Sequence, residues 1–183
     1  MQLENTRHCV TGLSVTGLMV GAALLFGYVP TVVATEDLPR EAVLPLSLAS
    51  TAASAALDRC EKDGHRVTVA VVDRAGILRA LMRGDGAGPH TVESSVKKAY
   101  TAASLRGATG DLAEMIAQMP AAQGLRDMNN NILVLAGGLP IEIGGEVVGG
   151  IGVGGAPGGH LDAACAQAGL DSIGAKPKFS SAK

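Results

Sequence analysis

Hydrophobic residues recur along the chain first at helical spacing and then at strand spacing. Residues 47–63 are rich in alanine and place their apolar positions near one helical face, and Gly64 stands where a helix would stop. Residues 66–88 are dense in β-branched side chains and are divided by a turn at Arg74–Gly76. This pattern predicts a helix followed by a hairpin of two strands.

The middle of the chain predicts two helices. Pro89 suits the first turn of a helix, and residues 90–105 carry small and apolar side chains at helical spacing. A further helix is expected to begin at Thr109, with Asp111 in its first turn, and to end before Pro120.

The pattern then returns to strands and ends in a helix. An apolar run over residues 129–143 is interrupted at Gly137–Gly138, and a second run over 144–156 begins with Gly144–Gly145, which suits a tight hairpin turn. Residues 158–173 predict the last helix. The expected fold is therefore α+β, an antiparallel sheet flanked by helices, in the order helix, two strands, two helices, two strands, helix. The strands lack clean polar alternation, which indicates a sheet buried on both faces or within an oligomer.

Three glycines in the last predicted strand, Gly150, Gly152 and Gly155, have the spacing G-x-G-x-x-G of a dinucleotide-binding loop. Such a loop needs a strand that ends before the first glycine, a helix that opens at the last, and an acidic residue about 20 positions later. Here the glycines lie inside a strand, and no strand follows the last helix. We interpret them as sites of close backbone approach, either by a packed helix or by a flat ligand.

The N-terminal segment has a different character. No charged residue occurs from Cys9 to Ala34, Arg7 and His8 stand just before this run, and Val32–Ala34 resembles a signal-peptidase site. These features are typical of a cleaved secretory signal, and an uncleaved membrane anchor is the alternative. We expect the domain to work outside the cytoplasm, either periplasmic or secreted. The chain is thus divided into a signal peptide (or anchor), a linker, a folded domain and a flexible tail: residues 1–34, 35–45, 46–174 and 175–183.

Export changes the interpretation of the cysteines. After cleavage Cys60 and Cys165 remain, in an oxidising compartment where they can form one disulfide. The alternative, which we favour, is that each is a small buried apolar residue on a helix. Without a C-x-x-C pair, neither a zinc cage nor a thioredoxin-type redox pair is expected.

Composition argues against nucleic acid as a partner. Aromatic residues make up 2% of the chain, there is no Trp, and the net charge of -2 comes from interspersed charges rather than basic clusters. No Ser-His-Asp arrangement, nucleophile elbow or paired carboxylates can be assigned from spacing, so the catalytic residues are unknown and it is open whether the protein is an enzyme.

Three stretches carry a resemblance in the same order along the chain: VAVVDRAGILRALMRGDGA (residues 69–87), SSVKKAYTAASL (residues 94–105) and the segment from ILVLAGGLPIEI to GLDSI (residues 132–173). They resemble the haem-binding HbpS and GlcG family, which is related to the C-terminal domain of PduO-type proteins. The resemblance implies a profilin-like sheet and homo-oligomers. Its exported members are similar to haem carriers or sensors, some with proposed haem degradation. The GlcG branch implies instead an accessory or oxidoreductase protein of hydroxy-acid metabolism. A third hypothesis is an oligomeric scaffold that partners a membrane sensor protein.

A haem site needs an axial donor for the iron, apolar walls and cations for the propionates. His90 and His160 begin two predicted helices beside glycine-rich strand tips, although a histidine in this position is most often simply exposed. The resemblance adds Thr101, because haem-binding relatives place a threonine near the iron at about this position. The alternative is that Thr101 is an ordinary helical threonine whose hydroxyl bonds the backbone carbonyl oxygen one turn earlier. Three cations bracket Thr101 in the sequence: Lys97, Lys98 and Arg106. They could bind the propionates, or they could form a solvated face of the helix. Acidic pairs are few, so we expect no site for free metal ions.

Overall fold

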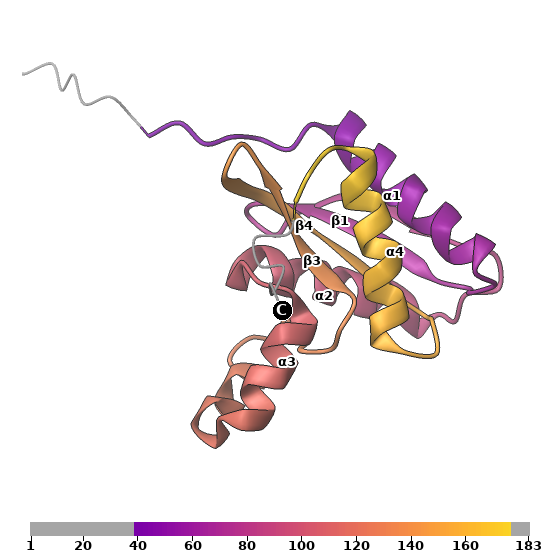
Figure 1. Ribbon diagram of the computed structural model, residues 1–183. Helices are drawn as coiled ribbons and strands as arrows, with labels where there is room; N and C mark the ends of the chain where they lie inside the picture. Colours follow the sequence, from indigo (N-terminus) through magenta and orange to yellow (C-terminus); the bar gives the residue numbers. More distant parts are fainter. Residues whose placement is uncertain (1–38, 177–183) are drawn as a thin grey trace, which may run out of the picture. The chain divides into compact units, whose positions relative to one another are not determined.

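The computed structural model describes residues 39–176 of the chain (Figure 1). The expected signal peptide or anchor lies outside these residues. The helices are α1 (Leu46–Lys62), α2 (His90–Leu105), α3 (Thr109–Gln118) and α4 (Gly159–Ser172), with a 3-10 helix η1 (Pro120–Arg126). The strands are β1 (Thr68–Asp73), β2 (Leu78–Arg83), β3 (Gly138–Ile143) and β4 (Glu146–Gly154). The predicted α+β class and element order are confirmed, with η1 as an addition.

The strands form one antiparallel sheet in the order β2-β1-β4-β3, and both predicted hairpins are present. The Asp73 carboxylate closes the first hairpin by accepting the backbone N–H groups of Ala75 and Ile77, each at 3.0 Å. Gly144 and Gly145 close the second with φ values of 63° and 85°, which a two-residue turn of this kind requires. The sheet register therefore follows from local turn chemistry.

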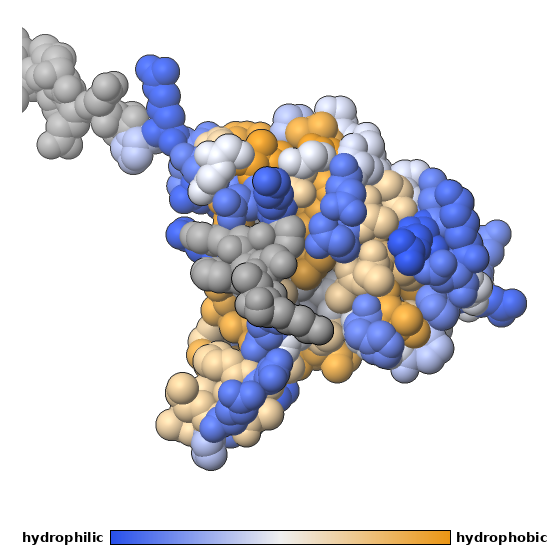
Figure 2. Space-filling view, in the orientation of Figure 1, coloured by the Kyte–Doolittle hydropathy of each residue, from blue (hydrophilic) through white to orange (hydrophobic). Residues whose placement is uncertain are grey.

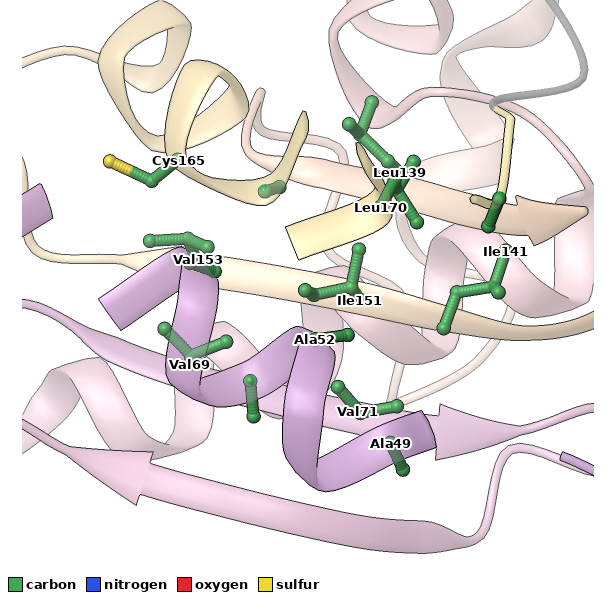
Figure 3. Packing of buried hydrophobic residues seen from close by; sticks show 14 of the residues in the cluster. Ala49, Ala52, Val69, Val71, Leu139, Ile141, Ile151, Val153, Cys165 and Leu170 are labelled. Atoms are coloured by element: carbon green, nitrogen blue, oxygen red, sulfur yellow. The ribbon is translucent and has the colours of Figure 1, made fainter. Parts of the chain in front are cut away.

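Helices cover both faces of the sheet: α1 and α4 pack on one face and α2 on the other (Figure 1). The larger hydrophobic cluster lies under α1 and α4, where side chains of β1 and β4 meet Ala49 and Ala52 of α1 (Figure 3). A smaller cluster under α2 joins Ala70 and Val72 to Ala99. We call the sheet together with α1, α2 and α4 the sheet body.

Strand β4 explains the glycine spacing. Its glycines face α2 and its branched residues face α1 and α4 (Gly150, Gly152 and Gly154; Ile151 and Val153). A β-carbon at Gly152 would overlap the carbonyl oxygen of Ser95 and lie 2.5 Å from the backbone nitrogen of Ala99. The glycines thus allow the α2 backbone to touch the strand, which confirms close approach by a packed helix at Gly150 and Gly152. The prediction that Gly155 lies inside the strand is wrong, because it follows β4 with a φ of 133° and approaches the backbone of Arg66.

A smaller unit stands beside the sheet body and is formed by α3, η1 and residues 129–136. We call it the α3 lobe. Its own cluster is centred on Ile116, Ile132 and Val134. The prediction of a strand over residues 129–143 is wrong in its first half, since β3 begins only at Gly138. The residues before it make turns and pack on α3, because the Leu133 N–H bonds a side chain of α2 instead of a neighbouring strand.

Both ends of the packed domain reach beyond the expected bounds of 46–174. Leu44 is fully buried, and Ala175 is buried at the other end. Lys176 pairs with Glu142 of β3 through two backbone hydrogen bonds of 3.1 Å. Part of the expected linker and the first residues of the expected tail are therefore packed against the domain.

A disulfide joins α1 to α4. Cys60 and Cys165 are bonded, with their Cα atoms 5.5 Å apart and a sequence separation of 105. The favoured interpretation of two unpaired cysteines is wrong, although both residues are buried as expected. The physical reason is that α1 and α4 pack directly against each other, so both thiols face the same interface.

Among residues 39–176, no helix combines the length and apolar character needed to cross a bilayer.

Candidate functional site

The two candidate histidines lie at helix starts on opposite faces of the sheet. His90 is the first residue of α2, His160 is the second residue of α4, and both are exposed. Each ring folds back over the glycine two positions earlier, Gly88 or Gly158, where a β-carbon would lie 2.9 Å from the ring Nδ1. They do not share a pocket with the other candidate residues.

Thr101 lies inside the structure, between α2 and the α3 lobe. Its hydroxyl donates to the Lys97 carbonyl oxygen at 2.7 Å, which is the helical back-bond considered as an alternative. The same oxygen accepts the Leu133 N–H at 2.8 Å. The side chain is fully buried. Thr101 therefore fixes the segment around Leu133 to α2, and both hydrogen-bonding functions of its hydroxyl are in use.

The adjacent lysines of α2 have different environments. Lys97 is partly exposed and pairs with Glu93 at 2.7 Å, one turn earlier on the helix surface. The hydrogen bond and the charge of Lys97 hold the pKa of Glu93 below its ordinary value of 4.5. Lys97 is thus on the solvated face, where it could still turn toward a ligand.

Lys98 is buried in an ion pair that the sequence analysis did not identify. Its ammonium group lies 2.8 Å from a carboxylate oxygen of Asp162, and the side chains are 2% and 4% exposed. It also donates to the Val153 carbonyl oxygen at 2.8 Å, while the second Asp162 oxygen accepts the Ala156 N–H at 3.0 Å. Because its donors point into the sheet body, Lys98 does not face a ligand. No local sequence signal separates it from Lys97, because its partner Asp162 is 64 positions away.

Arg106 lies at the rim of a hollow where α2 ends and α3 begins. It caps α2 with a φ of 54°, a left-handed conformation that is uncommon for a residue other than glycine. The hollow measures about 230 Å³ and is lined by Leu105, Arg106, Gly107, Ala108, Asp111, Leu112 and Met115. A second, more open hollow along α3 shares Asp111 and Met115. Among the described residues, Arg106 forms no ion pair.

The hollow has the chemistry of a site for a flat apolar ligand with acidic substituents. Leu105 and Leu112 supply apolar walls, Arg106 a cation, and Met115 a thioether; Asp111 adds one carboxylate at the rim. Ligand pockets commonly have about 300 Å³ or more, so this hollow covers only part of such a ligand. Figure 2 shows apolar surface beside hydrophilic side chains over the α3 lobe, where Met119 is 51% exposed. Within residues 39–176, no group of three or more His, Cys, Asp or Glu residues is arranged to hold a metal ion.

Solved structures with the same fold are known. An HbpS double mutant from Streptomyces reticuli superposes with a TM-score of 0.71 and 43% identity, over 79% of this chain and 97% of that one. A PduOC–heme complex superposes with a TM-score of 0.69 over 75% of this chain and 100% of that one; its 24% identity supports the fold alone.

Sequence comparison leads to the same group of proteins. Protein GlcG of Escherichia coli K12 is 32% identical over 111 residues, which are 61% of this chain and 81% of GlcG. The model of a family described as "Haem degrading protein HbpS-like" matches residues 44–171, from the buried Leu44 to the last turn of α4. The sheet, its glycine-rich strand and the α2–α3 junction thus all lie within the matched region, and the chain belongs to the HbpS-like family.

Proposed function

We propose that this chain is an exported haem-binding protein and that the hollow at the α2–α3 junction receives one edge of the tetrapyrrole. The observation that carries the proposal is that Arg106, which has no ion-pair partner among the described residues, lines a mostly apolar hollow in a member of a haem-associated family. Leu105 and Leu112 exclude water from the ring, and Arg106 holds a propionate. A bound haem would supply a redox-active iron.

The residues around the hollow have supporting roles. Thr101 keeps the α3 lobe in place through its hydrogen bond to Leu133, and so acts as a positioning residue. Lys97 lies on the outer face of the same helix and offers a second cation. His90 and His160, exposed at their helix starts, are accessible to a ligand at other surfaces of the subunit.

Reversible carriage is the activity that the hollow fits best. The lining contains no histidine or cysteine, so its contacts with iron are weak and haem could leave. We therefore propose a carrier that passes haem to a partner, which could be a membrane sensor protein. Haem degradation would appear as loss of the Soret band without transfer, when the loaded protein is given a reductant and oxygen.

Export is supported by the Cys60–Cys165 disulfide, because such bonds persist in oxidising compartments. Expression of the chain with its own first 34 residues tests this. A secreted form whose N-terminus lies near residue 35 is expected. Full-length protein retained in the membrane would indicate the anchor instead, and a cytoplasmic protein with free thiols would contradict export.

A second copy of the chain is proposed to complete the site, since the hollow is smaller than a haem needs. Strand β2 lies at the sheet edge, and this edge with the residue just before it exposes three apolar side chains: Ile77 (63%), Leu78 (47%) and Leu81 (36%). Sedimentation should show an oligomer that dissociates when Leu78 and Leu81 are both changed to Lys. Val43→Lys, which changes an exposed residue outside the sheet, is the control. A monomeric wild-type protein would contradict this part of the proposal.

Hemin titration of the mature domain, followed at the Soret band, tests the central proposal. Arg106→Asn removes the cation and suits the left-handed backbone, so affinity should fall about tenfold without loss of stability. Arg59→Gln is the matched control, because the Arg59 side chain is exposed on α1, and this variant should bind hemin as the wild type does. No spectral shift of wild-type protein at micromolar concentration would refute haem binding.

A further inference from the structure

The residues that follow α4 pack against the outer edge of β3. Ala175 is buried in the larger hydrophobic cluster, and Lys176 pairs with Glu142 through two backbone hydrogen bonds of 3.1 Å. Strand β3 is last in the sheet order, and apart from this bridge no segment among residues 39–176 pairs with its outer edge. Residues 177–183, with the sequence PKFSSAK, follow and lie outside the described residues.

The bridge sets a register for the residues that come next. Continuing the antiparallel pairing from Lys176 and Glu142 gives these pairs: Pro177 with Ile141, Lys178 with Pro140, and Phe179 with Leu139. Hydrogen-bonding groups alternate along an antiparallel pair, so Pro177 falls where no bond to β3 is made and Lys178 where one is made. A residue without an N–H thus stands at the position that needs none.

The outer edge of β3 suits a short segment that is already tethered to it. Pro140 faces outward, as Glu142 does, and offers a carbonyl oxygen but no N–H. A separate strand would lose one bond of the ladder there, whereas the Lys176 bridge keeps residue 178 at high local concentration. Further along, the Gly138 N–H donates to the Thr109 hydroxyl at 2.9 Å, so α3 closes the edge beyond Leu139.

Apolar and polar side chains alternate in this segment as in a strand with one buried face. The apolar residues are Ala175, Pro177 and Phe179, and the polar residues are Lys176, Lys178 and Ser180. Ala175 packs in the larger hydrophobic cluster, which also contains Leu139. In the continued register Phe179 would cover Leu139 at the margin of that cluster.

The carboxylate of Glu142 supplies an independent observation. Its Oε2 atom is buried without a hydrogen-bond partner, and Glu142 forms no ion pair within residues 39–176. A buried carboxylate oxygen without a partner is costly, and an ammonium group offsets that cost. In the continued register Lys178 is the diagonal neighbour of Glu142 on the same face, within reach of a long side chain.

From these observations we infer that residues 177–179 continue the pairing begun at Lys176 and form a short further strand along β3. The Lys178 N–H donates to the Pro140 carbonyl oxygen, its ammonium group lies beside the Glu142 carboxylate, and Phe179 covers Leu139. The occupant of this edge is therefore a segment of the same chain. The inference does not depend on haem binding, and it leaves β2 as the edge that is open to another copy.

Fluorescence and hydrogen exchange test the placement of the segment. The wild-type chain has no tryptophan, so Phe179→Trp introduces a single reporter. Its emission should lie at shorter wavelength than that of Ala182→Trp, the control outside the paired segment. In the wild-type protein the Lys178 amide should exchange at least about tenfold more slowly than the Ala182 amide. Exchange at Lys178 as fast as at Ala182 would overturn the inference, whatever the emission of the variant.

A change of charge tests the register. In the Phe179→Trp background, Lys178→Glu places a second carboxylate beside Glu142 and should shift the emission to longer wavelength. Lys183→Glu makes the same change of charge outside the paired segment and should leave the emission unchanged. An equal response of the two variants would contradict the register.

Dilution separates a segment of the same chain from that of a second copy. The slow exchange at Lys178 should not depend on protein concentration, because the segment is tethered to the edge that it covers. Exchange that becomes fast on dilution would assign the edge to residues 177–179 of another copy, and would overturn the inference.

Discussion

The sheet body and the α3 lobe are built on different principles. In the sheet body, small residues bring backbones into contact, as Gly152 does beneath α2, and a disulfide and a buried ion pair link its helices. The α3 lobe has a small cluster around Ile116, an irregular segment before β3 and exposed methionines. The first region has a hollow of only about 120 Å³ beside the β1–β2 turn, whereas the second borders the hollow of about 230 Å³.

This difference shows how one chain combines a closely packed, rigid region with a second region whose surface is accessible to a ligand. Close packing leaves no room in the sheet body for a ligand the size of a tetrapyrrole. The lobe meets α2 and β3 over a small area, so its surface can retain a hollow without weakening the main core. The following variants are ways to break or sharpen this contrast, from the largest expected effect to the smallest.

Breaking the buried ion pair should have the largest effect. Lys98→Met leaves the Asp162 carboxylate buried without its partner, and should lower the free energy of unfolding by about 3–5 kcal/mol. Adding Asp162→Leu to that variant should recover much of the loss, because no buried charge then remains. Urea unfolding measures both. A single variant as stable as the wild type would show that the pair is not buried in solution.

Removing the disulfide should cost slightly less. The bridge closes a loop of 105 positions, and loss of a native disulfide typically lowers the free energy of unfolding by about 2–5 kcal/mol. The variant with both Cys60→Ala and Cys165→Ala should unfold at lower temperature in calorimetry. Reductant should lower the wild-type melting temperature and leave that of the variant unchanged; equal sensitivity of the two would argue against the bridge.

Glycine-to-alanine changes compare the two regions directly. Gly152→Ala places a methyl group against the α2 backbone and should cost about 1–3 kcal/mol. Gly124→Ala in η1 meets no atom within 4 Å and has an ordinary φ, so it should be neutral or stabilise by less than about 1 kcal/mol. Chemical denaturation of the two variants measures the difference. Equal effects would contradict the close contact between β4 and α2.

Thr101 joins the two regions, and its loss should loosen only the lobe. Thr101→Val leaves the Leu133 N–H without its acceptor and should cost about 1–2 kcal/mol. Thr101→Ser keeps the hydroxyl and should retain most of the stability. Hydrogen exchange should be faster at Leu133 in the valine variant and unchanged in β1. Equally fast exchange throughout would mean that the lobe is not an independent unit.

The Glu93–Lys97 pair on the exposed face of α2 should have the smallest effect. Since Lys97 lowers the pKa of Glu93 in the folded state, the pair stabilises the fold above pH 4.5 and loses its effect as the pH falls through the lowered value. Glu93→Gln should therefore differ from the wild type near neutral pH and converge with it in acid. Salt should reduce this difference in the free energy of unfolding between the variant and the wild type. A difference that grew as the pH fell would contradict a stabilising Glu93–Lys97 pair.

The sequence was sufficient where structure depends on local chemistry. The Gly144–Gly145 turn and the close backbone approach at the glycines of β4 could be predicted directly, because both depend on local backbone conformation and on the lack of a side chain. The apolar run from Ile132 to Leu135 was misassigned, since the hydroxyl of Thr101, distant in sequence, accepts the hydrogen bond that a strand neighbour would otherwise accept.

The candidate site was predicted less well for the same reason. Arg106 was found by its charge, but the hollow beside it exists only because α3 turns back after the left-handed cap. Lys98 was predicted to meet a propionate or to lie on a solvated helix face, because its partner, Asp162, comes from a helix on the other side of the sheet and is distant in sequence.

The two borders of the sheet have unequal capacity to recruit another strand. At β3 the outward-facing position of Pro140 has no N–H to offer, and Glu142 is already paired with Lys176. At β2 the outer edge of the strand has no neighbouring strand among residues 39–176. Growth by strand addition would therefore join β2 to its own copy about a two-fold axis and stop there, so the subunit is protected against open-ended fibre formation by the asymmetry of its own sheet.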